Sequence, residues 1–503
     1  MAAQFPFSLA ELKEQTDQSL IDSSFVVHEN AAYWLTGVGA SKQLAVLAPH
    51  ASPAISAFAG KQSSFRDGYT LSYAELNHAH ARALRSLLPW LTPKPWGLRT
   101  TAGFGDRLGL ATPGHARALQ SVLAKAAGRP ITPFFAQQSI REMERTARSP
   151  EDVMTDATWG TFLAGWREGV GADADHLKTP ADIDACVAAG FSFYTIDPGA
   201  YVDSAVDTAP AAEVAAKVAD LPWEALEISQ KELEERYVGQ SYKLSSGEIV
   251  LEGDAVMRAA AKYGKAIAHV AKMYRHLASK NVPFELEVSV DETDTPTTHA
   301  EHIFIVQELR RLGVVWVSLA PRYVGSFEKG VDYIGDIDAL RRDLTVHAAI
   351  ARELGPYKLS LHSGSDKFSV YPIISELTEG VVHLKTAGTS YLEALRVIAS
   401  VDSKLFREIL DFDRARYETD RASYHVSAKV ELVPSASQLS DDQLPGLLED
   451  FHARQVLHVT FGSTLHQYGD TIKALLQAHE EAYAATLERH FIRHIEPFSQ
   501  RGA

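Results

Sequence analysis

Eight short apolar segments, each followed by a run with helical periodicity, recur between residues 96 and 400. Strands that alternate with helices favour a parallel sheet, because each helix returns the chain to the start of the next strand. The expected strands cover residues 96–106, 130–138, 168–175, 191–197, 284–292, 314–321, 357–364 and 381–388. Eight such units are the number that closes a (β/α)8 barrel. We therefore expect an α/β protein with a barrel of the TIM type.

Two further segments leave an alternative open. Residues 424–433 and 456–463 could also be strands, and one of them in the main sheet would favour an open, doubly wound sheet. Before the barrel, short strand signals and a helical run at 72–88 end in "LTPKPWG", whose prolines and glycine are typical of a boundary. The expected organisation is an N-terminal flanking region (1–95), a catalytic barrel (96–421) with an insertion after the fourth strand (198–253), and a helical C-terminal extension (422–503).

The composition is that of an ordinary folded protein, with 46% hydrophobic and 22% charged residues. A formal net charge of −15 argues against general binding to nucleic acids or to anionic membranes, because both need clustered lysine and arginine. The single cysteine, Cys186, allows no intrachain disulfide, and no apolar run approaches the roughly 18 residues of a membrane span. We expect a cytoplasmic protein that acts on a small molecule and could form a homo-oligomer.

Alternation within the expected strands aims polar side chains at the barrel axis. Helices cover the outside of a barrel, so the aliphatic face of each strand points outward and the opposite face points inward. In "FELEVSVDE" (284–292), Glu287 and Asp291 share the inward face. His362 in "YKLSLHSG", and His383 with Lys385 in "VVHLKTAG", face inward by the same reasoning. Buried charges survive only when they are paired or bound to metal.

Imidazoles and carboxylates from several strands form the ligand set of a divalent cation such as Zn²⁺, Mn²⁺ or Ni²⁺. The expected ligands are Glu287, His362 and His383, with Asp173 or His176 as the next candidate. The same residues could instead form a buried hydrogen-bond network or bind substrate without metal. The chain has no P-loop, no GxSxG elbow and no GxGxxG between a strand and a helix. Two histidine pairs, His78 with His80 and His490 with His494, are expected on solvated helix faces.

Five blocks in order resemble a known family. "GFGDRLGLATPGH", "GADADHLKT", "EVSVDETDTPT", "LHSGSDKFS" and "HLKTAGTSYLEALR" are similar to segments of the tagaturonate epimerases. Those metal-dependent enzymes interconvert tagaturonate and fructuronate, and relatives act on uncharged ketoses as tagatose 4-epimerases. The resemblance spans residues 96 to 400 and does not separate a sugar acid from a neutral sugar as the substrate. His299 and His302 in "TPTTHAEH" are not part of it and receive no role.

The resemblance implies inversion of a carbon β to a ketone, whose hydrogen enolisation does not acidify. A retro-aldol route, or a transient oxidation by a bound nicotinamide, could invert it, and the missing dinucleotide motif favours the first. The cation would polarise the ketone, two groups would transfer protons on the two faces, and cationic side chains would hold the substrate. The expected catalytic residues are Asp291, Asp366, Asp106 and Lys385. The expected substrate-binding residues are Arg107, Gln138, Lys178, Arg322, Ser365 and Lys367.

Two alternatives belong to other functional classes. One is a different metal-dependent sugar isomerase or an aldolase on the same barrel, which would release an aldose or two fragments. The other is a carbohydrate-binding protein without activity, which is disfavoured because inward carboxylates and lysines cost stability unless they serve a purpose.

Overall fold

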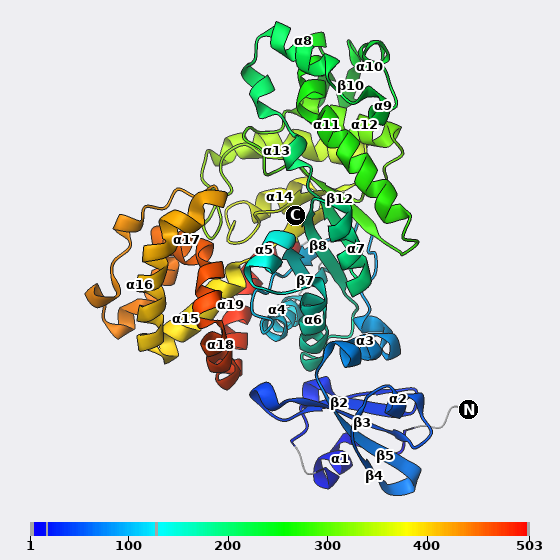
Figure 1. Ribbon diagram of the computed structural model, residues 1–503, viewed down its shortest axis with the longest axis vertical. Coiled ribbons are helices and arrows are strands. Elements are labelled where there is room, and N and C mark those ends of the chain that lie inside the picture. The colour runs from blue at the N-terminus through cyan, green and yellow to red at the C-terminus, as the bar shows by residue number, and fades with distance from the viewer. Residues whose placement is uncertain (1–4, 17–18, 126–128, 500–503) are drawn as a thin grey trace.

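Eight parallel strands form a closed barrel at the centre of the molecule (Figure 1). The computed structural model describes residues 5–16, 19–125 and 129–499. The strands are β6 (Thr101–Gly103), β7 (Thr132–Ser139), β8 (Gly171–Leu177), β9 (Phe193–Ile196), β12 (Glu285–Ser289), β13 (Ser318–Ala320), β14 (Lys358–Leu361) and β15 (Val382–Lys385). Neighbours along the chain pair with each other, and β15 pairs with β6 to close the ring. The predicted (β/α)8 barrel is confirmed, and each expected segment overlaps one of these strands.

Helices surround the barrel because their apolar faces cover the outward aliphatic side chains of the strands. They are α4 (Thr112–Lys125), α5 (Ile140–Arg145), α6 (Pro150–Leu163), α7 (Pro180–Ala189), α11 (Gly253–Ala278), α12 (His299–Arg311), α13 (Ile337–Glu353), α14 (Tyr371–Leu377) and α15 (Thr389–Val401). The ends of α7 show how the sequence fixes these helices. Thr179 caps its first turn, Pro180 opens it, and Gly190 ends it with a left-handed φ of 91°.

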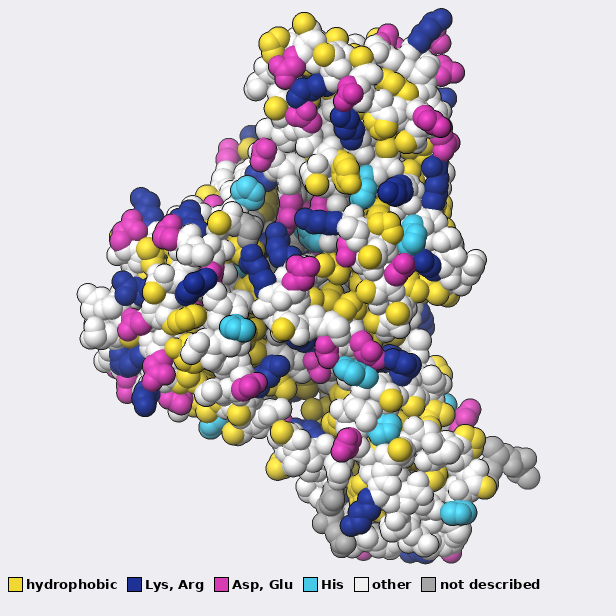
Figure 2. Space-filling model, viewed as in Figure 1, with side chains coloured by type: hydrophobic (Ala, Val, Ile, Leu, Met, Phe, Trp, Pro, Cys, Tyr) yellow, Lys and Arg dark blue, Asp and Glu magenta, His cyan; other side chains and the backbone are white. Residues whose placement is uncertain are grey.

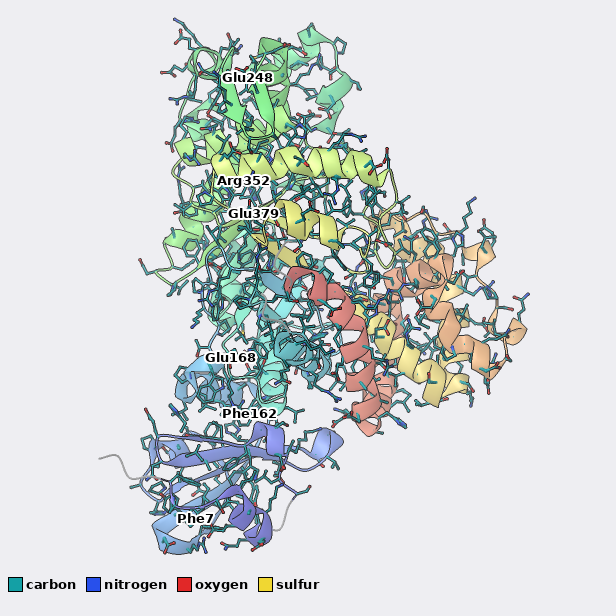
Figure 3. All side chains as sticks on the ribbon, turned by 180° about the vertical axis from the view of Figure 1, so that it is seen from behind. Phe7, Phe162, Glu168, Glu248, Arg352 and Glu379 are labelled. Atoms are coloured by element: carbon teal, nitrogen blue, oxygen red, sulfur yellow. The ribbon has the colours of Figure 1, made fainter. Side chains whose placement is uncertain are left out.

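The N-terminal region folds as a separate antiparallel sheet below the barrel in Figure 1. Its strand order is β1 (Val26–His28), β2 (Ala31–Thr36), β3 (Gln43–Pro49), β5 (Tyr69–Glu75) and β4 (Gly60–Ser64). The helical run expected from residue 72 begins only at His78, in α3 (His78–Leu87), because residues 69–75 pair with β3 and β4. Phe162 of α6 packs into the core of this sheet, and Figure 3 shows it at the junction with the barrel.

The insertion after the fourth barrel strand forms a small helical layer at the far end of the molecule from the N-terminal sheet (Figure 1). It contains α8 (Ala211–Ala219), α9 (Trp223–Leu226), α10 (Gln230–Tyr237) and a hairpin of β10 (Ser241–Leu244) and β11 (Gly247–Val250). These elements pack on α11 and α12, and so they extend the outer helical layer without reaching the barrel axis.

The C-terminal residues form a helical lobe beside the barrel (Figure 1). The lobe consists of α16 (Ser403–Asp420), α17 (Phe451–Val459), α18 (Phe461–Ala478) and α19 (Glu480–Ser499). Helix α19 packs on α4, α14 and α15, and Figure 3 shows it crossing the back of the barrel. Residues 424–433 hold a single helical turn, and 456–463 fall within α17 and α18, so the open-sheet alternative is wrong. Residues 453–459 are buried all round, and a fully buried helix shows no polar face that would distinguish it from a strand.

No helix within the described residues is long and apolar enough to cross a membrane.

Candidate active site

Lys385 lies among three carboxylates at the carboxyl end of the barrel. Its Nζ atom is 2.6 Å from Asp175, 2.8 Å from Glu287 and 3.1 Å from Asp173, and all four side chains are buried. Burial alone would lower the pKa of the Lys385 ammonium, but the three carboxylates outweigh it and raise the pKa well above its usual value. Lys385 is therefore a permanent cation that holds its neighbours ionised.

Glu287 is fixed by four strands. Its carboxylate accepts hydrogen bonds from Ser318 Oγ at 2.6 Å and Thr195 Oγ1 at 3.0 Å, and one oxygen lies 2.5 Å from His362 Nε2. Burial would raise the pKa of Glu287, yet the charges of Lys385 and His362 hold it well below the ordinary value. The carboxylate thus orients the His362 ring and leaves Nδ1 to face the cavity.

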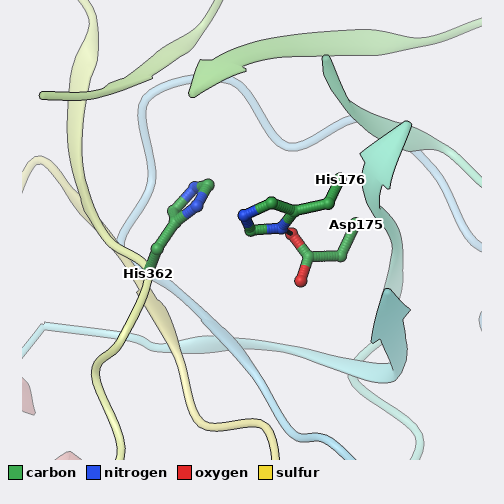
Figure 4. A group of neighbouring side chains, drawn as sticks. All are labelled: Asp175, His176 and His362. Carbon is green, nitrogen blue, oxygen red and sulfur yellow. Dashed lines mark hydrogen bonds and ion pairs between the residues drawn. The ribbon is translucent and has the colours of Figure 1, made fainter. Parts of the chain in front are cut away.

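A bulge at the end of β8 brings His176 to the same place. The pairing of β8 with β9 shifts register between Ala174 and Leu177, and His176 has a left-handed φ of 53°. Asp175 and His176 therefore both face the site, although strict alternation would send them to opposite faces. Figure 4 shows the His176 ring between the Asp175 carboxylate and the His362 ring. His176 Nδ1 lies 2.8 Å from Asp175 Oδ1.

Each of these imidazoles has one nitrogen held by a carboxylate and a second nitrogen turned toward Asp291 at the cavity. Among the described residues, His176 Nε2 and His362 Nδ1 are buried and make no well-aligned hydrogen bond. Asp291 Oδ1 lies 3.2 Å from His362 Nδ1 and 4.0 Å from His176 Nε2. A carboxylate that orients a histidine whose second nitrogen is free is the usual surrounding of a metal-binding histidine. Ligand atoms of Asp175, His176 and His362 all lie within 4.8 Å of one another. The residues therefore fit a divalent cation.

The electrostatics of the cluster agree with this fit. Burial lowers the pKa of His176, but Asp175 and Glu292 outweigh it and raise the value to about 10. Burial and Lys385 lower the pKa of His362, but Glu287 and Asp291 raise it to about 9. The negative field that favours a proton on each imidazole also favours a dication between them.

The predicted ligands divide into two layers. His176 and His362 come together with Asp175, which was not among the predicted ligands. Glu287 contacts His362 on the side of the ring that faces away from the cavity and orients it. His383 lies deeper in the barrel, with Nδ1 2.7 Å from Thr101 Oγ1 and Nε2 3.4 Å from Asp173 Oδ2. Both nitrogens of His383 are engaged, and its ring packs on aromatic side chains. His383 and Asp173 therefore support the site from below and do not face the cavity.

A cavity of about 170 Å³ opens beside the cluster, and its size suits a single sugar molecule. Its charged and imidazole side chains include Arg141, Asp291, Glu292, Arg322, Lys329 and His362. Figure 2 shows lysine and arginine side chains gathered in the hollow between the barrel and the C-terminal lobe. Arg141 pairs with Glu292 at 2.9 Å, whereas Arg322 and Lys329 have no carboxylate within ion-pair distance among the described residues. Lys329 donates only to Ser363 Oγ, at 3.0 Å.

Asp106 and Arg107, expected at this site, serve the structure of the first barrel loop instead. The Asp106 carboxylate accepts backbone N–H bonds from Leu108, Gly109 and Ala111 at 2.7–3.0 Å. The Arg107 guanidinium is buried, donates to Glu142 at 2.6 Å and lies over the Phe461 ring. The structure therefore does not bring either side chain to the cavity.

Asp366, predicted as a proton carrier, belongs to a separate buried cluster under the C-terminal lobe. Its carboxylate lies 2.9 Å from Arg454 Nη2 and 2.9 Å from His490 Nε2. His494 Nε2 accepts the Asp366 N–H at 3.0 Å. His490 and His494 are buried, so their expected place on a solvated face is wrong, because α19 packs against the barrel along that face. His80 is likewise buried, with Nδ1 2.7 Å from the Glu75 carbonyl oxygen.

The remaining predicted side chains also have structural partners. Lys367 donates to the carbonyl oxygens of Glu328 and Ser365 at 2.8 and 3.0 Å, and burial lowers its pKa to about 7. Ser365 Oγ donates to the Ala387 carbonyl oxygen at 3.0 Å. Gln138 Oε1 accepts from Arg148 at 3.0 Å. Lys178 is exposed and pairs with Asp197 at 3.3 Å. Of the expected substrate-binding residues, Arg322 alone lines the cavity.

Comparison with known proteins gives one consistent match. The tagaturonate epimerase family matches residues 21–498. A tagaturonate/fructuronate epimerase of Thermotoga maritima is 42% identical over 478 residues, covering 94% of this chain and 96% of the relative. The native crystal structure of a fructuronate-tagaturonate epimerase from Cohnella laeviribosi superposes with a TM-score of 0.88 and 33% identity, covering 97% of this chain and 98% of that one. A glycerol complex of the same enzyme gives the same TM-score.

Proposed function

The chain belongs to the tagaturonate epimerase family and is a carbohydrate epimerase, and from this premise we propose that it interconverts tagaturonate and fructuronate. The reaction inverts the hydroxyl-bearing carbon β to the ketone of a ketohexuronate. The proposal specifies the substrate class, a divalent cation and a retro-aldol route, and each rests on separate features of the site.

The substrate class rests on the two cations of the cavity wall that have no carboxylate partner. Arg322 and Lys329 line a cavity whose third cation, Arg141, is already paired with Glu292. A cation that lines a small cavity and forms no ion pair with the described residues favours an anionic ligand, because a charge-assisted hydrogen bond to a carboxylate is stronger than one to a neutral hydroxyl. This observation supports a sugar acid over a neutral ketose such as tagatose.

The metal requirement rests on the two imidazole nitrogens that face the cavity beside Asp291. His176, His362 and Asp175 or Asp291 would hold Zn²⁺, Mn²⁺ or Ni²⁺, with Glu287 orienting His362. When bound, such a cation polarises a substrate ketone and stabilises negative charge that develops on its oxygen. Lys385 keeps Asp175 and Glu287 ionised beneath it.

The proton-transfer group is the Asp291 carboxylate at the cavity. Asp291 accepts a hydrogen bond from Ser289 Oγ at 2.5 Å, and His362 and His176 outweigh its burial and hold its pKa well below the usual range. As an ionised base, Asp291 takes the proton from the hydroxyl of the carbon to be inverted. The bond from that carbon to the α-carbon then breaks, giving an aldehyde and an enediolate. The aldehyde rotates, the bond re-forms on its other face, and Asp291 returns the proton to the new alkoxide. Glu292 is held ionised by His176 and Arg141 and therefore has no proton to donate.

A product assay tests the proposal. Purified protein, stripped with EDTA and reloaded with Mn²⁺, Ni²⁺ or Zn²⁺, is incubated with tagaturonate or tagatose, and the products are separated by chromatography. We expect fructuronate from tagaturonate only in the reloaded samples. Activity that survives stripping, with no bound metal by elemental analysis, contradicts the metal requirement. An aldose or two stable fragments as the product would instead indicate a different isomerase or an aldolase.

Isotopic substitution separates the two routes. Deuterium on the inverted carbon of tagaturonate gives a primary kinetic isotope effect if a hydride leaves that carbon. In the retro-aldol route the deuterium stays in place, so we expect only a small secondary effect. A large primary effect would refute the route.

A further inference from the structure

A second cluster of histidines lies outside the active site, between helices α12 and α13. His299 is the first residue of α12, and Asp343 and His347 lie one turn apart on the same face of α13. Asp343 Oδ1 is 3.0 Å from His299 Nε2 and 3.5 Å from His347 Nε2. The proposed reaction uses none of these side chains.

Nε2 of His347 has no close hydrogen-bond partner among the described residues: Asp343 Oδ1 lies 3.5 Å away, and the ring also faces the Thr297 backbone. The side chain is completely buried, and its Nε2 atom makes no hydrogen bond. Its Nδ1 atom lies 2.8 Å from His302 Nδ1, and His302 Nε2 lies 2.7 Å from the Tyr357 hydroxyl. A polar atom left unpaired in the interior is costly unless a ligand completes it.

The three ligand atoms lie within 4.8 Å of one another, and the two separations measured from Asp343 suit a small cation. Tetrahedral Zn²⁺, with bonds of about 2.0–2.1 Å, keeps its ligand atoms about 3.3–3.4 Å apart. The two distances from Asp343 Oδ1, 3.0 and 3.5 Å, lie on either side of that separation. We propose that His299, Asp343 and His347 form a second divalent-cation site, distinct from the active site and suited to Zn²⁺. About one third of the His299 side chain is exposed, so water can reach the remaining coordination position.

The surrounding hydrogen bonds suit a metal-bound His347. If Nε2 of His347 offers its lone pair to the cation, the proton sits on Nδ1 and is donated to His302 Nδ1. His302 then carries its own proton on Nε2, where the Tyr357 oxygen accepts it.

The site lies directly behind the wall of the substrate cavity. Asp343 Oδ2 accepts the Val324 N–H at 3.3 Å, and the Tyr323 ring packs on His347 at 5.6 Å. The adjacent Arg322 N–H donates to Thr297 Oγ1 at 3.1 Å, just before α12 begins. A cation joining α12 to α13 would brace the loop that carries Arg322, so its role is structural support of the cavity wall.

Metal stoichiometry tests the proposal without relying on activity. Stripped protein is equilibrated with Zn²⁺ and the bound metal is measured by elemental analysis, for the wild type and for His299→Gln, Asp343→Asn and His362→Gln. We expect the wild type to bind two ions, and each single variant to bind one. His276→Gln is the matched control, because His276 forms a surface pair with Asp184 at 2.7 Å that has no third ligand. This variant should bind two ions.

A thermal shift supplies the second readout. In the His362→Gln background, Zn²⁺ should raise the melting temperature, and adding His299→Gln should abolish the rise. The proposal is overturned if the wild type binds one ion that His362→Gln alone removes, or if His299→Gln and Asp343→Asn both retain two. If the active site takes no metal, one ion should remain in His362→Gln and disappear in His299→Gln. That result would refute the metal requirement of the proposed function and leave this site standing.

Discussion

Replacing Arg322 by glutamine removes one positive charge from the cavity wall and leaves a shorter polar side chain. Arg322 lines the cavity and has no carboxylate partner among the described residues, so the change breaks no ion pair within the protein. If the guanidinium holds the substrate carboxylate, the loss should appear with the sugar acid and be nearly absent with the neutral ketose.

The magnitude follows from the strength of one charge-assisted hydrogen bond. Such a bond contributes about 1.5–3 kcal/mol, and each ~1.4 kcal/mol is a factor of ten. We therefore expect kcat/KM for tagaturonate to fall about 10- to 150-fold. With tagatose the same variant should stay within about threefold of the wild type, because glutamine can still bond a hydroxyl. Lys329→Gln should show the same asymmetry, since Lys329 is the other unpaired cation of the cavity.

The assay measures initial rates with both substrates under saturating metal, with epimer formation followed by chromatography. Lys231→Gln is the control for the change of net charge, because Lys231 lies on the exposed surface of α10, with 84% of its side chain accessible. It should leave both rates unchanged. An equal loss with tagaturonate and tagatose would refute the reasoning, because it would show that Arg322 supports the fold of the cavity. Full activity of the double variant Arg322→Gln/Lys329→Gln on tagaturonate would refute it as well.

Three further outcomes are expected. Asp291→Asn should lower kcat by about 100-fold or more while the melting temperature changes little, because it removes a proton acceptor and keeps the shape; an active variant would exclude this base. Lys385→Met should destabilise the fold by about 3–5 kcal/mol, since it leaves buried carboxylates unpaired, and Glu287→Gln in the same chain should restore part of the loss in calorimetry. Burial raises the pKa of Asp413, in α16, to about 8. Because this folded-state pKa lies above the unfolded value of about 4, the stability contribution of Asp413 is fully present below pH ~4 and is lost as pH rises through about 8. Asp413→Asn should therefore have a flatter melting profile than the wild type between pH 5 and 8, and parallel profiles would contradict this.

The barrel and the direction of its side chains could be predicted because both depend on local periodicity. Alternation placed Glu287, His362 and Lys385 on the inward face, and the structure brings these three together. The bulge at His176 could not be predicted, because it depends on how β8 pairs with β9 and on a left-handed backbone that no residue type signals here. Asp175 shares the face of Asp173 by alternation alone, so it could have been included among the candidate ligands.

The loops were harder to predict than the strands. Lys329 lies in an irregular loop with no period to follow, and nothing in the sequence places it at the cavity. Asp106, Arg107 and Asp366 follow strand ends as an active-site residue would, yet Asp106 is bound by the backbone of its own loop, Arg107 by Glu142 of α5, and Asp366 by residues of the C-terminal lobe. The fold of that lobe over the barrel decides the contacts of Asp366.

The sequence by itself determined the eight strand–helix units, the inward polar faces and the family, because each depends only on the order and periodicity of residues that are neighbours in the chain. The tertiary structure alone decided which inward groups share a cavity and which are already neutralised. Glu142 pairs with Arg107 although the two lie 35 residues apart in the sequence, and Lys385 pairs with Asp175 although they lie 210 residues apart. Charge compensation over such separations arises only when the chain folds, and it separates the unpaired cations of a binding site from the paired cations of a core.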